Sequence, residues 1–194
     1  MLRKDGHDIE SLGEELKNED ERIEIFKEKT QCIFSGSLVN YMIESGFFTC
    51  PSSTKHHGAF EGGNFWHSRM VAILLREYTE KMKLQWERPE SPEIIGWAHD
   101  LCKMDEYIKV SDGVGRYHYE SNQNASMTGH GMKSAIIALE RMKLTDEEVH
   151  CITWHMGAFV GKENWKNYSA AVKKYPNILW VHQADMIASY VNGI

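Results

Sequence analysis

Gly96-Trp97-Ala98-His99-Asp100-Leu101-Cys102-Lys103 carries a histidine, an aspartate and a lysine within an otherwise apolar stretch. Ser91-Pro92-Glu93 before it has the features of a helix start, because serine caps free N–H groups, proline suits the first helical position and glutamate complements the positive end of the helix dipole. A helix over residues 92–103 is therefore predicted. A buried carboxylate costs free energy unless it is paired or bound to a metal, and Lys103 shares the helix face of His99 and Asp100. This helix is therefore expected to carry a functional site.

Further histidines and one aspartate occur singly within other apolar, helix-like segments. They are His67, His130, His155 and Asp185. Together with His99 and Asp100 they provide four imidazoles and two carboxylates, a donor set that suits Fe, Mn, Zn or Co better than Ca or Mg alone. Because a catalytic zinc keeps only about three protein ligands, we expect two metal ions that share the set, with Asp100 as the bridge.

Each of these histidines also has a simpler interpretation. Taken alone, His67 would be a core histidine and His130 a helix-capping or surface histidine. Purely structural roles for all of them would require several coincidences on apolar helices, so a metal site is the favoured hypothesis. His182, one turn before Asp185, is either a partner of that carboxylate or a core histidine. The His56-His57 pair is either solvated surface or part of a lid on the substrate side of the metals.

The composition is that of one globular domain. The chain has 194 residues, of which 42% are hydrophobic and 26% charged, and this is enough to bury a core. Residues 1–20 are acid-rich and are expected to form a polar N-terminal arm, followed by a single domain over residues 21–194. The net charge of −6 and the lack of a long Lys/Arg run disfavour an extended nucleic-acid surface.

No feature of the sequence indicates export or membrane insertion. The N-terminus lacks the apolar core of a signal peptide, and no apolar run reaches the roughly 18 residues of a membrane span. The cysteines are scattered without a C-x-x-C pair: Cys32, Cys50, Cys102 and Cys151. A cytoplasmic protein with free thiols is expected. No pattern specifies an oligomeric state.

Hydrophobic periodicity predicts an all-α fold with a small β-hairpin. Residues 106–120 are expected to form the hairpin, with Asp112-Gly113 as its turn. Residues 46–64 and 157–166 are expected to be irregular. The predicted helices cover residues 21–45 with a break at Ser35-Gly36-Ser37, residues 64–84, 92–103 and 130–142, a segment opened by the capping box at Thr145, and a last segment that starts at Pro176.

The ordered set of His67, His99-Asp100 and Asp185 resembles the HD-domain superfamily of metal-dependent phosphohydrolases. The added His130 and His155 are similar to the two-metal branch of that superfamily, and the resemblance covers residues 30–192. Such proteins often continue as His-Asp-apolar-Gly-Lys. Here Cys102 stands in place of the usual glycine while the lysine is kept, a departure that affects helix packing more than metal binding.

The resemblance implies an HD-domain helical bundle around two divalent metal ions, chosen from Fe, Mn, Zn, Co and Mg. His67, His99, Asp100 and Asp185 would hold one metal, and Asp100, His130 and His155 the second. A metal-bound hydroxide would cleave a phosphate ester of a nucleotide or similar small molecule, with Asp100 and Lys103 as the catalytic residues. Lys103, Arg69 and Lys133 would bind the phosphate, although Arg69 and Lys133 are also explained as surface cations.

Two other functions are compatible with the same ligand order. Di-iron oxygenases of this superfamily, which act on inositol or aminophosphonates, present it as well, and a non-catalytic HD protein would use it to sense a nucleotide or metal. A mononucleotide or cyclic dinucleotide is a more plausible substrate than a polymer. Trp66, Trp154, Tyr117 and Tyr119 would either stack a base or belong to the core.

Overall fold

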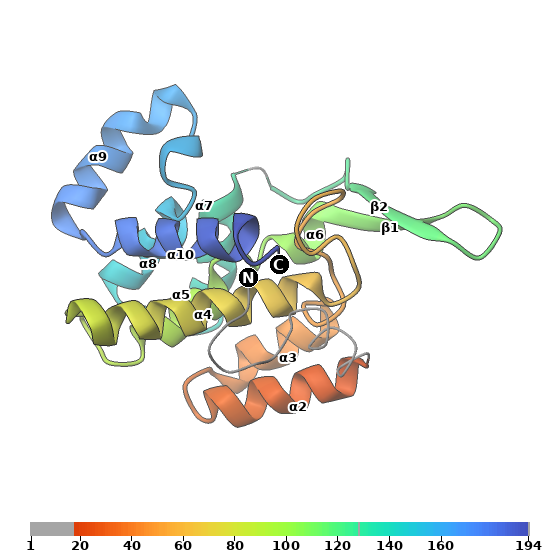
Figure 1. Ribbon diagram of the computed structural model, residues 1–194, viewed down its shortest axis with the longest axis horizontal. Helices are drawn as coiled ribbons and strands as arrows, with labels where there is room; N and C mark the ends of the chain where they lie inside the picture. The colour runs from red at the N-terminus through yellow and green to blue at the C-terminus, as the bar shows by residue number, and fades with distance from the viewer. Residues whose placement is uncertain (1–17, 128, 194) are drawn as a thin grey trace.

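The structure, a computed structural model, describes residues 18–127 and 129–193. Within these ranges it is mainly helical, with one two-stranded antiparallel sheet (Figure 1), which confirms the expected helical fold with a hairpin. The helices are α2 (Glu19–Thr30), α3 (Gly36–Glu44), α4 (Gly63–Met82), α5 (Ser91–Ala98), α6 (Lys103–Glu106), α7 (His130–Leu139), α8 (Asp146–Trp154), α9 (Trp165–Lys174) and α10 (Ile178–Tyr190). The strands are β1 (Tyr107–Ser111) and β2 (Tyr117–Ser121).

The long helix α4 joins the layers of the bundle. In Figure 1 it crosses the middle of the molecule, with α2 and α3 on one side and α10 on the other, while the hairpin projects from the body. Phe65, Val71 and Leu75 of α4 are fully buried, because neighbouring helices cover this helix on more than one face. Side chains on α4 can therefore meet residues from both sides of the bundle.

Helices α4 and α5 pack closely because small residues meet where they touch. A Cβ atom on Gly96 would collide with the backbone of Ala72 on α4, so a larger residue at position 96 would push the helices apart. Every residue of α5 is buried. The close packing brings the end of α5, and with it His99, next to His67 on α4, with 3.1 Å between their Nε2 atoms.

The helix that leads to His99 and Asp100 is shorter than predicted. α5 ends at Ala98, residues 99–102 form turns, and α6 follows. Side chains from other helices hold these turns: Asn64 donates to the carbonyl of Asp100 (3.3 Å), and the Cys102 amide donates to the hydroxyl of Ser134 (3.1 Å). The predicted helix over residues 92–103 is therefore wrong at its end, where local turn bonds and the bond from the Cys102 amide to Ser134 take the place of helical ones.

The helix starts follow the sequence in one case and depart from it in two. The capping box at Thr145 is confirmed, since its hydroxyl accepts from the Glu148 amide (3.2 Å) and the Glu148 carboxylate accepts from the Thr145 amide (2.9 Å). Ser91 is not a cap: it lies within α5, and its hydroxyl donates to Glu148 at 2.8 Å. The last helix begins at Ile178 instead of Pro176.

The predicted hairpin is confirmed, but its turn is longer than two residues. Pairing ends at Ser111 and Tyr117, which leaves residues 112–116 as the loop. The Asp112 carboxylate shapes this loop by accepting hydrogen bonds from the amide and the guanidinium of Arg116, at 3.0 and 2.9 Å. The aspartate therefore closes the loop through its side chain, which the dipeptide signal did not reveal.

The segment after α8 is more helical than predicted. Two short 3-10 helices, η1 (Gly157–Phe159) and η2 (Lys162–Asn164), occupy the stretch expected to be irregular, and α9 follows.

The predicted N-terminal arm lies outside the described residues except for residues 18–20, of which the last two belong to α2. Among the described residues, no helix is long and apolar enough to cross a membrane. The four cysteines are free thiols.

An ion pair between a partly exposed arginine and a buried carboxylate connects the segment before α5 to α8. The fully buried carboxylate of Glu148 accepts two hydrogen bonds from the guanidinium of Arg88, both at 2.7 Å. The hydroxyl of Ser91 is a further donor to the same carboxylate. These bonds fix α8, which leads to His155, relative to α5, which leads to His99.

Arg88→Ala should lower the free energy of unfolding by about 3 kcal/mol, because it leaves a buried carboxylate without its charged partner. Urea denaturation measures the change. The matched control is Lys81→Ala, which removes the exposed pair between Lys81 and Glu77 (3.1 Å) and should cost less than about 1 kcal/mol. Equal losses in the two variants would show that the pair of Arg88 and Glu148 does not hold α8 in place.

Candidate metal centre

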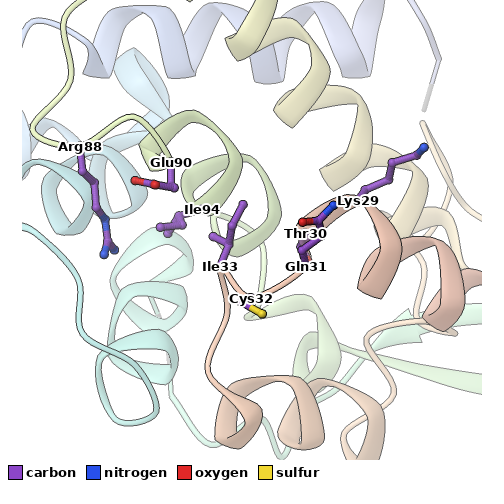
Figure 2. Close-up of a pocket in the computed structure, with 8 residues that line it drawn as sticks. All are labelled: Lys29, Thr30, Gln31, Cys32, Ile33, Arg88, Glu90 and Ile94. Atoms are coloured by element: carbon purple, nitrogen blue, oxygen red, sulfur yellow. The ribbon is translucent and has the colours of Figure 1, made fainter.

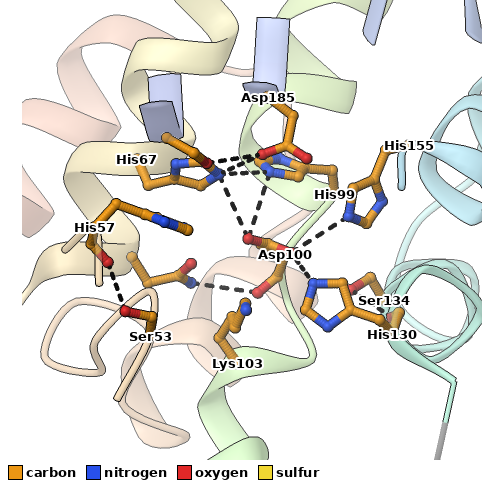
Figure 3. Close-up of polar contacts among 12 residues, drawn as sticks. Ser53, His57, His67, His99, Asp100, Lys103, His130, Ser134, His155 and Asp185 are labelled. Atoms are coloured by element: carbon orange, nitrogen blue, oxygen red, sulfur yellow. Dashed lines mark hydrogen bonds and ion pairs between the residues drawn. The ribbon is translucent and has the colours of Figure 1, made fainter. Parts of the chain in front are cut away.

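The expected ligand side chains meet in one cluster inside the bundle (Figure 3). Separate elements supply them: His67 comes from α4, His99 and Asp100 from the turns after α5, His130 from the start of α7, His155 from the residue after α8, and Asp185 from α10. The cluster is largely shielded from water, since its most accessible side chain, that of His130, is 22% exposed. The sequence thus correctly identified a set of residues that come together.

Asp100 lies at the centre of the cluster, and its two carboxylate oxygens face different histidines. Oδ2 lies 3.5 Å from Nε2 of both His67 and His99. Oδ1 lies 2.7 Å from Nε2 of His130 and 3.6 Å from Nε2 of His155. The single carboxylate of Asp100 therefore lies between two pairs of imidazoles.

Asp185 extends the first of these groups. Its Oδ1 lies 3.1 Å from Nε2 of His67. Burial would raise the pKa of Asp185, but the hydrogen bond with His67 and the surrounding imidazoles hold this pKa well below its usual range. The carboxylate is therefore an anion, as a metal ligand must be.

Two groups of side chains in the cluster are compact enough to hold metal ions. Within each group the possible ligand atoms lie within 4.8 Å of one another. One group is His67, His99 and Asp100, and the other is Asp100, Cys102 and His130. Asp100 belongs to both.

His99 and His155 turn their Nε2 atoms toward the cluster. In each ring Nδ1 bonds the carbonyl three residues earlier, that of Gly96 (2.9 Å) or Ile152 (2.8 Å). Because a carbonyl only accepts, Nδ1 carries the proton and Nε2 keeps a lone pair. Burial lowers the pKa of His155 to about 3, so this imidazole is neutral.

The lone pair of His155 provides the clearest test of whether a metal fits. Its Nε2 atom is buried and has no hydrogen-bond partner among the described residues. The nearest carboxylate oxygen, Oδ1 of Asp100, is itself an acceptor and cannot donate to it. A metal ion would satisfy the lone pair of His155 and the carboxylate of Asp100 together, so the donor set fits a metal ion.

His130 is oriented by a second carboxylate. Its Nδ1 lies 3.1 Å from Oε1 of Glu106 and 3.3 Å from Sγ of Cys102, while its Nε2 faces Asp100. Burial raises the pKa of the Cys102 thiol, which keeps the thiol protonated in the absence of a metal. Glu106 is then the acceptor for Nδ1–H, in the arrangement that commonly orients metal-bound histidines.

Lys103 is a buried cation at the edge of the cluster. Its ammonium group donates to the hydroxyl of Tyr107 (3.1 Å) and lies 4.0 Å from Oε2 of Glu106. Burial would lower the pKa of Lys103, but the Asp100 carboxylate and further neighbours raise it above its usual value. The side chain is therefore charged and held in place.

The other two cations predicted to bind phosphate lie elsewhere. Lys133 is buried in an ion pair with Asp105, at 2.6 Å, and lines a different cavity. The guanidinium of Arg69 lies over the ring of Trp66, 5.4 Å from its centroid. Of the three predicted cations, Lys103 is the one that lines the cavity at the metal cluster.

A cavity of about 360 Å³ opens onto the cluster. Its lining combines ligands and Lys103 with groups that the sequence did not assign to the site: Phe159, Tyr190, Met156, Met186 and Ser189. The aromatic residues Trp66, Trp154, Tyr117 and Tyr119, considered above as base-stacking groups, are not among the lining residues. Trp66 and Tyr119 are buried, which agrees with the alternative that they belong to the core.

His57 also lines this cavity, as the lid hypothesis required, whereas His56 is exposed. The ring centroid of His57 lies 5.5 Å from that of His67. Ser53 fixes the backbone here, since its hydroxyl donates to the His57 carbonyl and accepts from the His56 amide, both at 2.9 Å. These two hydrogen bonds hold the loop in place as one wall of the cavity.

His182 supports the cluster indirectly. Its Nδ1 donates to the carbonyl of His155 at 2.9 Å. Its ring also packs against Gly157, where a Cβ atom would collide with the imidazole. His182 therefore supports the backbone of His155, a candidate ligand, instead of bonding to Asp185.

A larger cavity, of about 610 Å³, lies between the end of α2 and the start of α5 (Figure 2). The cations that line it already have partners, since Lys29 pairs with Glu28 at 3.0 Å and Arg88 with Glu148 at 2.7 Å. The candidate metal ligands are not among its described lining residues. Its size alone does not make it a catalytic site.

Comparisons of the chain with models of protein families, with curated proteins and with solved structures return no match. Functional conclusions therefore depend on the geometry of the cluster and its cavity.

Glu106→Ala should weaken divalent-metal binding by about 10- to 100-fold, because His130 loses the carboxylate that orients its ring. Titration with Zn²⁺ or Mn²⁺ against a competing chelator measures the affinity. The matched control is Glu120→Ala, which removes a carboxylate 2.8 Å from the exposed His118 on the hairpin. Unchanged affinity in Glu106→Ala would mean that His130 needs no such support or is not a ligand.

Proposed function

We propose that this protein is a metal-dependent phosphohydrolase that cleaves a phosphate ester of a nucleotide or a similar small molecule. The observation that carries the proposal is the position of Asp100, whose two oxygens face separate histidine pairs with Lys103 at the same cavity. Histidine and carboxylate donors together suit Fe, Mn, Zn or Co. A fixed lysine beside them suits a phosphate group.

The candidate metal donors form two sets that share the carboxylate of Asp100. His67, His99 and Asp185 would hold one metal with Asp100, and His130 and His155 would hold the second. Bound metals would supply a water molecule of lowered pKa and positive charge beside the phosphoryl oxygens.

The protein itself contributes the fixed orientation of these groups. Backbone carbonyls set the tautomers of His99 and His155, and Glu106 sets that of His130. Since the rings are held before substrate arrives, little reorganisation is needed when charge develops. The surrounding apolar helices keep bulk water away from the ligands.

Lys103 would bind and neutralise the phosphate. The hydroxyl of Tyr107 positions its ammonium group, and Asp100 keeps it charged. The attraction between this fixed cation and the phosphoryl oxygens increases as negative charge grows on those oxygens. Asp100 and Lys103 are accordingly the residues whose loss should be most damaging.

Lys103→Met should lower kcat/KM for p-nitrophenyl phosphate or nucleotide hydrolysis by about 10²- to 10³-fold, because one preorganised charge is removed from the site. Its metal content should stay unchanged. Asp100→Asn should lose both metal and activity. Elemental analysis and phosphate release are measured on the same preparations, with Lys109→Met, a change at an exposed lysine on β1, as the matched control.

Full hydrolytic activity in Asp100→Asn would sink the proposal. Oxygen uptake by the iron-loaded protein with a polyol or phosphonate, in the absence of phosphate release from any ester, would replace the hydrolase with an oxygenase. Tight nucleotide binding without either reaction would indicate a sensor.

A further inference from the structure

The charge balance of the cavity at the cluster limits how many phosphate groups it can bind. Its charged lining residues include Asp100 and Asp185, with Lys103 as the one lysine or arginine among the described lining residues. Each additional phosphate of a polyphosphate would need its own cationic or hydrogen-bonding partners. The cavity volume of about 360 Å³ is near the lower end of the range for small-molecule sites. Both features favour one phosphate on a small organic group.

The wall of the cavity beyond Lys103 is apolar and aromatic. Phe159 is 63% exposed and Tyr190 is 75% exposed, yet both line the cavity. The ring of His57 lies 6.5 Å from that of Tyr190, and Met156 and Met186 complete this wall. Large apolar side chains grouped at the mouth of a polar site commonly mark where a ligand is covered.

Phe159 is held at the cavity by the backbone around it. Gly157 has a φ of +57° and packs on the ring of His182, so a side chain at this position would be both strained and obstructed. The Phe159 ring itself lies 6.1 Å from the ring of His182. Because His182 also bonds the carbonyl of His155, one residue supports both a candidate ligand and an aromatic side chain of the mouth.

We propose that the site binds a phosphate monoester whose organic group is a flat ring, with Phe159 and Tyr190 as the residues that contact the ring and determine specificity. This inference rests on the proposed function, since it assumes that the phosphate lies at Lys103 and the metals. The organic group then extends to the aromatic wall. Aromatic side chains favour flat rings because stacking needs no specific hydrogen bonds.

Binding of phosphonates to the metal-loaded protein tests the inference without turnover, because the P–C bond is not an ester. Isothermal titration calorimetry should show phenylphosphonate binding roughly 5- to 150-fold more tightly than methylphosphonate. Cyclohexylphosphonate, which is of similar size but not flat, should fall between them. Phe159→Ala and Tyr190→Ala should each reduce the preference for the phenyl compound, while Phe159→Tyr and Tyr190→Phe should retain it.

Tyr117→Ala is the matched control, since it removes a 48% exposed tyrosine from the hairpin, away from the cavity. Equal binding of phenylphosphonate and methylphosphonate, or a preference that survives in both alanine variants, would overturn the inference and leave the phosphohydrolase standing. If neither phosphonate binds and no ester is cleaved, both proposals fail. A higher kcat/KM for adenosine 5′-triphosphate than for the 5′-monophosphate would contradict the restriction to one phosphate.

Discussion

The carboxylate of Asp100 is buried among imidazoles, and the organisation of the site follows from the need to compensate it. Burial alone would raise the pKa of Asp100, but His99, Lys103 and His130 hold it well below its usual value, so the group is an anion. His99 and His155 turn lone pairs toward the same space, because their Nδ1 protons are bound by backbone carbonyls. Acceptors gathered in one buried space need proton donors or a cation between them, and a metal ion would bind several of them at once. The buried Nε2 of His155, which has no hydrogen-bond partner among the described residues, is the physical reason to interpret the cluster as a candidate ligand set.

The bundle holds this arrangement through contacts that a motif does not contain. Gly96 lets α5 approach α4 closely enough for His99 to reach His67. Asn64 and Ser134 then hold the turns that follow α5. The ion pair between Arg88 and Glu148 fixes α8 on the other side. A change at any of these positions would move a ligand without touching it, so the site and the core share one set of constraints.

The meeting of the candidate ligands was predictable because each is a polar residue in an apolar helical pattern, and a buried polar residue needs a partner. The end of α5 was not predictable, since it depends on the hydrogen bonds that the turns after α5 make with Asn64 and Ser134. Glu106 carried a weak signal, being one turn after Lys103, but its contact with His130 depends on the packing of α6 against α7. Phe159 and Tyr190 carried no signal at all. They lie in a short 3-10 helix and at the end of α10, and only the folded chain brings them to the mouth of one cavity.

Metal content per chain on anaerobically purified protein, compared with that of His130→Ala, tests the central claim most directly. A centre bridged by Asp100 should hold about two metal ions in the parent protein and about one in the variant, because only the group containing His155 loses a ligand. A metal retained by His67, His99, Asp100 and Asp185 in the variant would show that its fold is intact. About one metal in both proteins would contradict the account, since His130 and His155 would then not be ligands and Asp100 would bridge nothing.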